Sequence, residues 1–356
     1  MDIYSTVRVN VGQGYEVTIG RGILNCCGQL ISELLTTRRV AIVTDSNVQP
    51  LYLERVVRSL EDSGFTATFF AFEAGELSKN ISTLGAILEF FARSGLTRKD
   101  CAIALGGGVV GDITGFAAGC YMRGIDYVQM PTTMLAAIDS SVGGKTAIDL
   151  DAGKNLAGLF IQPKAVLCDV DCMSTLSPEI YVDGLAEAVK ASILNDPELF
   201  SMFEHGEAAD KPEIVIDRCV RFKARIVEQD EKETGLRKLL NLGHTPAHAI
   251  EKLSDFSVTH GRAVAMGLGI IARASAKHGY CSAECAERIC RALAGCGLQD
   301  NADYSADEMA RVAASDKKRT AGGVSVVLVR DIGECIFEEI SLEKISGLFA
   351  DGMEQA

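Results

Sequence analysis

The chain has 356 residues, of which 47% are hydrophobic and 23% charged, and its formal net charge is −13. This length suggests two domains that each bury a core, and the acidic balance argues against a nucleic-acid partner. No apolar run approaches the roughly 18 residues of a membrane span, and the first residues lack the pattern of a signal peptide. We therefore expect a cytoplasmic protein without a membrane partner, whose 12 cysteines stay reduced.

Short β-rich runs alternate with helical stretches in the first half of the chain. The predicted strands cover residues 40–44, 66–72, 101–105, 127–130 and 165–169, and the predicted helices cover residues 51–63 and 81–94. Strands joined by helices of this length predict a parallel sheet with crossover connections.

The pattern changes after about Leu176. Alanine-rich helical periodicity dominates to about Ala314, and residues 324–329 are the one late strand that we predict. We expect an α/β N-terminal domain with a Rossmann-like nucleotide-binding sheet over residues 1–175. A mainly α-helical C-terminal domain is predicted over residues 176–356, with the active site in the cleft between the domains.

A glycine-rich loop follows the predicted strand 101–105. Its spacing, Gly106-x-Gly108-x-x-Gly111, fits a dinucleotide fingerprint. Such glycines let the backbone approach a pyrophosphate, and the N-terminus of the following helix directs N–H groups at the anion. The usual ribose-binding acid follows the glycines, whereas the best acid at a strand end here is Asp45, far upstream. The loop therefore predicts a variant nucleotide fold.

Two glycine turns carry lysines. The run 140–146 resembles the end of a P-loop, but Asp139 stands where the leading glycine would be needed, so an NTPase is disfavoured. Lys145 follows paired glycines, and Lys154 follows Gly153. Each lysine alone is typical of a solvated surface charge, whereas together they indicate an anion-binding wall.

Three of the five histidines, His244, His248 and His260, lie within 17 residues. Thr245 before Pro246 is typical of an N-cap with proline at the first helical position. This places His244 just before a helix and His248 in its first turn. The pattern predicts divided roles, with one imidazole on a metal and the other free for proton transfer; ordinary packing is the alternative.

Glu187 interrupts an apolar stretch and is the best candidate for a carboxylate ligand. A lone buried carboxylate is costly unless it is paired or coordinated. Metal coordination together with a second imidazole, His260, would account for it. The alternative is an ion pair between Glu187 and Lys190 or Lys223.

Many motifs of one family occur in order along the chain. They are Thr44–Asn47, Gly75–Lys79, Gly106–Asp112, Arg123-Gly124, Pro131–Thr133, Asp139–Lys145, Gly153–Asn155, Gly184–Glu187, Asn241–Thr245, His260-Gly261 and Asp316–Lys318. In these motifs the sequence resembles the 3-dehydroquinate synthases of the sugar-phosphate cyclase superfamily.

The resemblance implies bound NAD, a divalent zinc or cobalt ion, an anionic sugar-phosphate substrate and a homodimer. The metal would lie on Glu187, His244 and His260. The implied NAD-binding residues are Asp45, Asn47, Glu76, Lys79, Gly107, Gly108, Asp112, Thr132, Thr133, Asp139, Lys145, Lys154, Cys172 and Thr175. The implied substrate-binding and catalytic residues are Arg123, Lys145, Lys154, Asn155, Lys223, Arg237, Asn241, His248 and one of the pair Lys317 and Lys318, of which we favour Lys317.

The implied substrate is 3-deoxy-D-arabino-heptulosonate 7-phosphate. NAD would take a hydride from a ring carbinol, phosphate would leave by β-elimination, and NADH would return the hydride. Ring opening and an internal aldol closure would then give the carbocycle, 3-dehydroquinate. His248 is the candidate for relaying the proton of the oxidised hydroxyl.

Two positions depart from the family pattern. Pro246-Ala247 stands where an aromatic residue and glycine are common, and Arg262 stands where a glutamate commonly follows His-Gly.

Three other functions stay open. One alternative is a cyclase for an aminocyclitol or seven-carbon antibiotic precursor. The others are a metal-dependent NAD alcohol dehydrogenase and a catalytically silent NAD-binding module.

Overall fold

A computed structural model of the chain describes residues 1–316 and 323–354. The chain forms two compact units. The first contains Met1–Leu176 and Lys223–Lys232, and the second contains Ser177–Phe222 and Glu233–Ala356. The division therefore falls within one helix, α7 (Pro212–Gln229).

The first unit is built on a seven-stranded sheet with the order β1-β2-β9-β6-β5-β3-β4. Every neighbouring pair is parallel except β1 with β2, which is antiparallel. The strands are β1 (Asp2–Val9), β2 (Tyr15–Arg21), β3 (Arg39–Asp45), β4 (Thr66–Phe72), β5 (Cys101–Gly106), β6 (Asp126–Pro131) and β9 (Ala165–Asp169).

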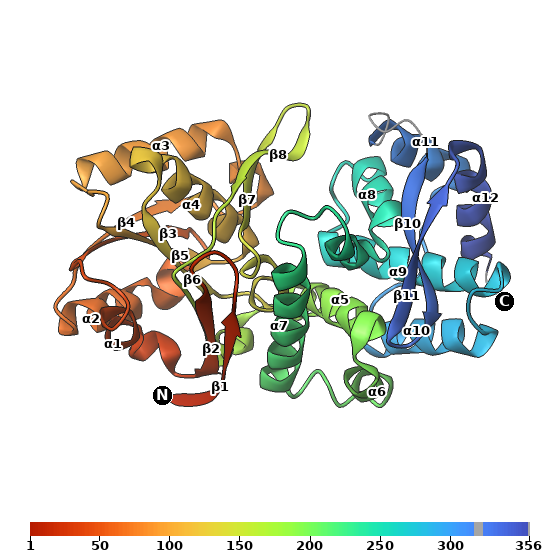
Figure 1. The fold of residues 1–356 in the computed structure, drawn as a ribbon, viewed down its shortest axis with the longest axis horizontal. Helices are drawn as coiled ribbons and strands as arrows, with labels where there is room; N and C mark the ends of the chain where they lie inside the picture. Colours follow the sequence, from red (N-terminus) through yellow and green to blue (C-terminus); the bar gives the residue numbers. More distant parts are fainter. Residues whose placement is uncertain (317–322, 355–356) are drawn as a thin grey trace. The chain divides into compact units, whose positions relative to one another are not determined.

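Helices cover both faces of this sheet. They are α1 (Cys27–Ser32), α2 (Glu54–Asp62), α3 (Ile81–Arg93) and α4 (Gly108–Cys120). Figure 1 shows α3 and α4 on one face and α1 and α2 on the other. Every residue of β5 is buried, which explains its continuous apolar sequence. Ile87 and Phe91 of α3 share a core with Ile113 and Ala117 of α4.

A separate antiparallel hairpin, β7 (Lys145–Leu150) and β8 (Gly153–Phe160), packs against α4. The sequence did not predict these strands, because β7 buries only two residues, β8 buries none, and a glycine-lysine pair stands at the start of each strand. The hairpin carries Lys145 and Lys154, so both lysines of the predicted anion-binding wall lie on one element.

The second unit is mainly helical and is organised around α9 (His260–Lys277). This helix contacts α5, α8, α10, α12 and β10 and buries most of its residues. The other elements are α5 (Pro178–Asn195), α6 (Pro197–Glu204), α8 (His244–Leu253), α10 (Ala283–Gly295), α11 (Ala306–Asp316), α12 (Leu342–Met353), β10 (Val324–Asp331) and β11 (Glu334–Ile340).

The predicted fold class, a parallel α/β region followed by a mainly helical region, is confirmed. The prediction of a single late strand is wrong, because β10 pairs with a second strand, β11. Among the described residues, no helix combines the length and the apolar character that a membrane crossing requires.

Candidate functional site

Several of the predicted nucleotide residues lie at or directly after the carboxyl ends of adjacent parallel strands. In the register of the sheet, Val43 of β3 pairs with Ala104 of β5, so Asp45 lies level with Gly106. In the pair formed by β5 and β6, Gly106 is opposite Pro131, and Pro131 directly precedes Thr132 and Thr133. The upstream position of Asp45 is thus explained, because the sheet order places β3 beside the strand that leads into the glycine loop. Ligands of open α/β sheets bind at this edge.

The glycine-rich loop leads directly into α4. The helix begins at Gly108, and its N-cap, Gly107, has an extended backbone and no side chain that could bond the first N–H groups. Helix N-termini of this kind bind anions. The observed loop therefore has the strand-loop-helix context that the fingerprint requires.

A buried lysine connects three of the predicted residues. Lys79 is 4% exposed, and its Nζ donates to Asp112 Oδ2 at 2.6 Å and to Asn155 Oδ1 at 2.5 Å. Glu76 Oε1 lies 4.0 Å from the same nitrogen. Burial raises the pKa of Asp112 and of Glu76. Burial opposes the charge of Lys79, but Asp112 and Glu76 outweigh it and raise the pKa of Lys79.

A second lysine joins a predicted substrate residue to a predicted NAD residue. Lys223, on the part of α7 that belongs to the first unit, donates to the Asp139 backbone oxygen at 2.6 Å and lies 2.8 Å from Asp139 Oδ1.

Three further predicted residues of the first unit, Asp45, Thr175 and Arg123, lie at strand ends or in turns. Asp45 accepts hydrogen bonds from the backbone of Asn47 and Val48, both at 2.9 Å. Thr175 shares a hydrogen bond with Tyr52 and donates to the Cys172 carbonyl at 3.0 Å. Arg123 lies in an exposed turn after α4, in a left-handed backbone conformation with φ 70°.

Glu187, His244 and His260 converge in the second unit. One ligand atom from each lies within 4.8 Å of the others. Three helices supply them, since Glu187 is in the middle of α5 while His244 and His260 begin α8 and α9. Oε1 of Glu187 is 3.5 Å from His244 Nε2 and 3.2 Å from His260 Nε2. The sequence-predicted metal ligands are thus brought together.

The surroundings of these groups shift their protonation strongly. Burial, then the charge of Lys190, lowers the pKa of His244 to about 3. Burial also opposes the charge of His260, but hydrogen bonding to Glu187 and Glu251 raises its pKa to about 10. Burial opposes the charge of Glu187, yet Lys190 and the imidazoles hold its pKa well below the ordinary range.

His248 lies one turn after His244 on α8 and is exposed. The two rings are edge to face with centroids 5.5 Å apart, and the His260 ring lies 5.4 Å from that of His244. Arg237 and Asn241 lie on the short helical turn that precedes α8; Arg237 is buried, and Asn241 donates to Glu233 at 3.2 Å. The predicted Lys317 and Lys318 fall outside the described residues.

Comparison with known proteins decides the family. The family model for the N-terminal part of 3-dehydroquinate synthase matches residues 69–183, and that for the C-terminal part matches residues 184–319. A 3-dehydroquinate synthase from Clostridium acetobutylicum is 41% identical over 342 residues, which cover 94% of this chain and 96% of that protein. The chain belongs to the 3-dehydroquinate synthase family.

Solved structures of two sugar-phosphate cyclases resemble this member of the 3-dehydroquinate synthase family. A 2-deoxy-scyllo-inosose synthase, complexed with carbaglucose-6-phosphate, NAD+ and Co2+, has a TM-score of 0.87 at 23% identity, covering 98% of this chain and 100% of that one. A 2-epi-5-epi-valiolone synthase from Streptomyces hygroscopicus subsp. jinggangensis, with NAD+ and Zn2+ bound, also has a TM-score of 0.87, at 25% identity over 95% of this chain and 96% of that one.

The structure adds residues that the family motifs did not reveal. Lys190 contacts Oε2 of Glu187 one helical turn away, with the two side chains 4% and 2% exposed. This ion pair was an alternative to metal coordination, and it involves the oxygen that does not face the histidines. Glu251 of α8 lies 3.6 Å from His260 Nδ1. The i, i+3 spacing of Glu187 and Lys190 had indicated their ion pair from the sequence, whereas nothing local indicated Glu251.

The predicted start of α8 is wrong. His244 is the first helical residue, and the N-cap is Gly243 in a left-handed conformation with φ 76°, instead of Thr245. Proline is accepted throughout the first helical turn, where N–H groups lack helical partners, so Pro246 did not fix the boundary. The consequence is that His244 and His248 lie one turn apart on the same face of the helix.

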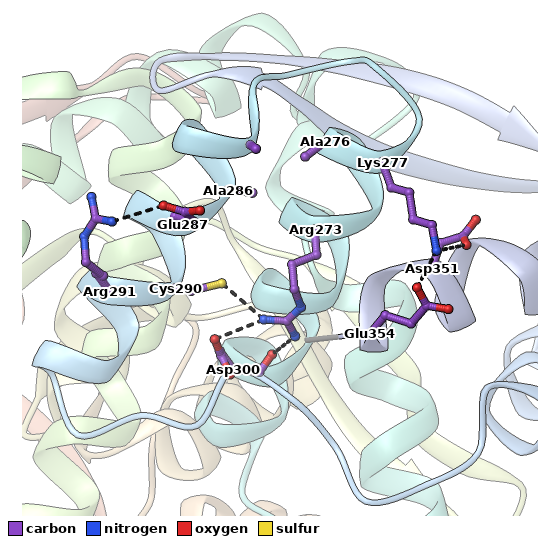
Figure 2. A pocket seen from close by; sticks show the side chains of 11 residues that line it. Arg273, Ala276, Lys277, Ala286, Glu287, Cys290, Arg291, Asp300, Asp351 and Glu354 are labelled. Carbon is purple, nitrogen blue, oxygen red and sulfur yellow. Dashed lines mark hydrogen bonds and ion pairs between the residues drawn. The ribbon is translucent and has the colours of Figure 1, made fainter. Parts of the chain in front are cut away.

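A cavity of about 580 Å³ opens elsewhere in the second unit, between α9, α10 and the end of α12. Figure 2 shows its charged side chains paired with one another: Arg273 with Asp300 at 3.0 Å and Lys277 with Asp351 at 2.7 Å. Arg273 is 13 residues along α9 from His260, roughly 20 Å at 1.5 Å per residue.

Proposed function

We propose that this chain is a 3-dehydroquinate synthase, a carbon-oxygen lyase that converts 3-deoxy-D-arabino-heptulosonate 7-phosphate to 3-dehydroquinate and phosphate. The observation that carries the proposal is the convergence of Glu187, His244 and His260 in a chain that is 41% identical to a protein of that name. NAD and a divalent ion, zinc or cobalt, are the proposed cofactors.

The three converging side chains fit a divalent metal. His244 Nδ1 lies 3.1 Å from the Leu242 carbonyl oxygen, and a carbonyl only accepts, so the proton is on Nδ1. Nε2 then directs a lone pair at Glu187 Oε1. Two acceptors face each other favourably only across a cation or a proton. One carboxylate and two imidazoles leave a coordination position for substrate, as in catalytic zinc sites.

The first unit fits a dinucleotide. The glycine loop delivers the uncapped N-terminus of α4, and Asp45 and Thr132 follow strands that flank β5. The proposed role of residues 1–175 is NAD binding and that of residues 176–356 is metal and substrate binding, although proposed substrate ligands such as Lys145 also occur in the first range.

Cationic side chains supply the proposed site for the phosphate. Lys145 and Lys154 lie on the β7–β8 hairpin, and Lys223 lies beside Asp139. Arg237 and Asn241 precede α8 in the other unit. Positive charge stabilises the leaving phosphate as its negative charge develops. The proposed substrate ligands therefore include residues of both units.

The two cofactors, when bound, would acidify the hydroxyl to be oxidised and accept and return a hydride. His248 is the proposed proton relay, since its exposed imidazole lies beside His244 but does not join the three converging groups. A neutral imidazole can accept the proton of that hydroxyl and return it later. The anionic phosphate is held by the lysines and arginines until it departs.

The decisive experiment measures products from the purified chain with NAD+ and Co2+ or Zn2+. We expect equal amounts of phosphate and 3-dehydroquinate from the heptulosonate phosphate, with no net NADH absorbance. No phosphate release would reject the proposal. Phosphate release only from glucose 6-phosphate or from a seven-carbon sugar phosphate other than this heptulosonate would indicate another cyclase, and steady NADH accumulation with a polyol would indicate an alcohol dehydrogenase.

The proposed assembly is a homodimer in the cytoplasm, without nucleic-acid or membrane partners. Light scattering after size exclusion tests the dimer. A mass near the 38.0 kDa of one chain would contradict it.

A further inference from the structure

We propose that Asp183 and Gly261 are positioning residues that fix His260 opposite Glu187. This inference rests on the metal-binding role proposed for these two groups. Neither Asp183 nor Gly261 contributes a ligand atom to the converging cluster. They lie where the backbone of α9 approaches that of α5 closely.

Asp183 caps α9 from a different helix. The N-cap of α9 is Thr259, whose own side chain makes no cap hydrogen bond to the helix. Instead, Asp183 Oδ1 accepts from the Thr259 hydroxyl and from the backbone N–H of Arg262, the latter at 3.0 Å. One carboxylate oxygen therefore binds the residue before His260 and an N–H of the first turn. The first turn of α9 is held by α5.

The same face of α5 carries the metal-site carboxylate. Asp183 and Glu187 are four residues apart on α5, so their side chains leave the helix on one face. Asp183, on one turn of α5, contacts the N-terminus of α9. Glu187, on the next turn of α5, places its Oε1 3.2 Å from His260 Nε2. The cap thus sets the separation of the two proposed ligands.

Gly261 makes this approach possible. A Cβ built on Gly261 would lie 1.9 Å from the Asp183 backbone oxygen, far inside any real contact. Backbone cannot yield as the end of a flexible side chain can, so any larger residue would force α5 and α9 apart beside His260. The requirement for glycine directly after the histidine is therefore steric.

The test measures Co2+ affinity and the visible absorption of bound Co2+ in the full chain after chelator treatment. We expect Asp183→Ala to weaken Co2+ binding about tenfold, the lower end of the range for residues that orient metal ligands, and to alter the absorption. Asp183→Asn keeps an acceptor oxygen and should restore both. Gly261→Ala should weaken binding at least as much as Asp183→Ala.

Asp196→Ala is the matched control. Asp196 also caps a helix, accepting from Leu199 N at 3.0 Å, and it lies 2.7 Å from Arg218. Its loss should lower the melting temperature while leaving Co2+ affinity and absorption unchanged. Thr259→Val, which removes one donor to Asp183, gives a milder version of the test if Asp183→Ala does not fold.

Two results would overturn the inference in distinguishable ways. If Asp183→Ala and Thr259→Val melt earlier but bind Co2+ as the wild type does, Asp183 is only a structural cap and the metal site stands. If the wild type and Glu187→Gln bind Co2+ equally, the proposed metal site itself fails, and this inference fails with it.

Discussion

Lys190 and Glu187 form an ion pair that is almost completely buried. Breaking such a pair leaves an uncompensated charge and costs about 3 kcal/mol or more. We expect Lys190→Met to lower the unfolding free energy of the metal-free chain by about 3 kcal/mol, measured by urea denaturation. Lys277→Met is the control, because Lys277 pairs with Asp351 and Glu354 on the surface, where ion pairs contribute little. Equal losses in the two variants would contradict a special role for the buried pair.

Substitution of each histidine should remove either metal binding or turnover, and this difference tests the proposed roles. His244→Ala and His260→Ala should be purified with little bound metal, because each removes one of three converging donors. His248→Ala should keep its metal and lose turnover by about 10²–10⁴-fold, the usual contribution of a general base. Elemental analysis beside a phosphate-release assay distinguishes them. Full metal content in His244→Ala, or metal loss in His248→Ala, would reverse the assignment.

At the scale of elements, the sequence predicted the helices and strands whose bounds depend on the local sequence pattern. Strand β4 was predicted with its observed bounds, Thr66–Phe72, because apolar and β-branched residues form one uninterrupted run. Strand β11 was missed because four of its seven residues, ECIFEEI, are acidic or cysteine, and its pairing with β10 is a tertiary contact. The sequence singled out the converging residues Glu187, His244 and His260, whereas the Asp183 cap joins residues 76 apart in sequence. Such a contact has no local signal.

Lys79, which lies outside the β7–β8 hairpin, makes two hydrogen bonds to it. The Lys79 carbonyl accepts from Asp149 N at 2.7 Å, and its Nζ donates to Asn155, so backbone and side chain both hold the hairpin. We expect Lys79→Ala to speed amide hydrogen exchange across residues 145–160 about tenfold, since it removes a charge-assisted hydrogen bond. Lys164→Ala, which breaks a 3.7 Å ion pair with Asp126 in the same unit, should leave the hairpin unchanged. Unchanged exchange in Lys79→Ala would show that the hairpin is held by its packing on α4.

At the scale of the whole molecule, the proposed cofactors belong to different units. The proposed NAD residues Asp45, Gly107 and Thr132 lie at the carboxyl edge of the sheet, and the proposed metal ligands lie where α5, α8 and α9 meet. Each cofactor should therefore stabilise its own unit first. At a concentration 100 times its dissociation constant, a ligand adds about 2.7 kcal/mol to the state that binds it.

Hydrogen exchange can locate this stabilisation. Zn2+ added to the chelator-treated chain should slow exchange up to about hundredfold in the first turns of α8 and α9. NAD+ should slow it at the ends of β3 and β5 and in the glycine loop. In Glu187→Gln the effect of Zn2+ should disappear while that of NAD+ persists, because Glu187 lies outside the unit that carries the sheet. Protection of α8 and α9 by Zn2+ in Glu187→Gln would place the ion elsewhere, and NAD+ protection absent from β3 and β5 would remove the nucleotide from the sheet edge.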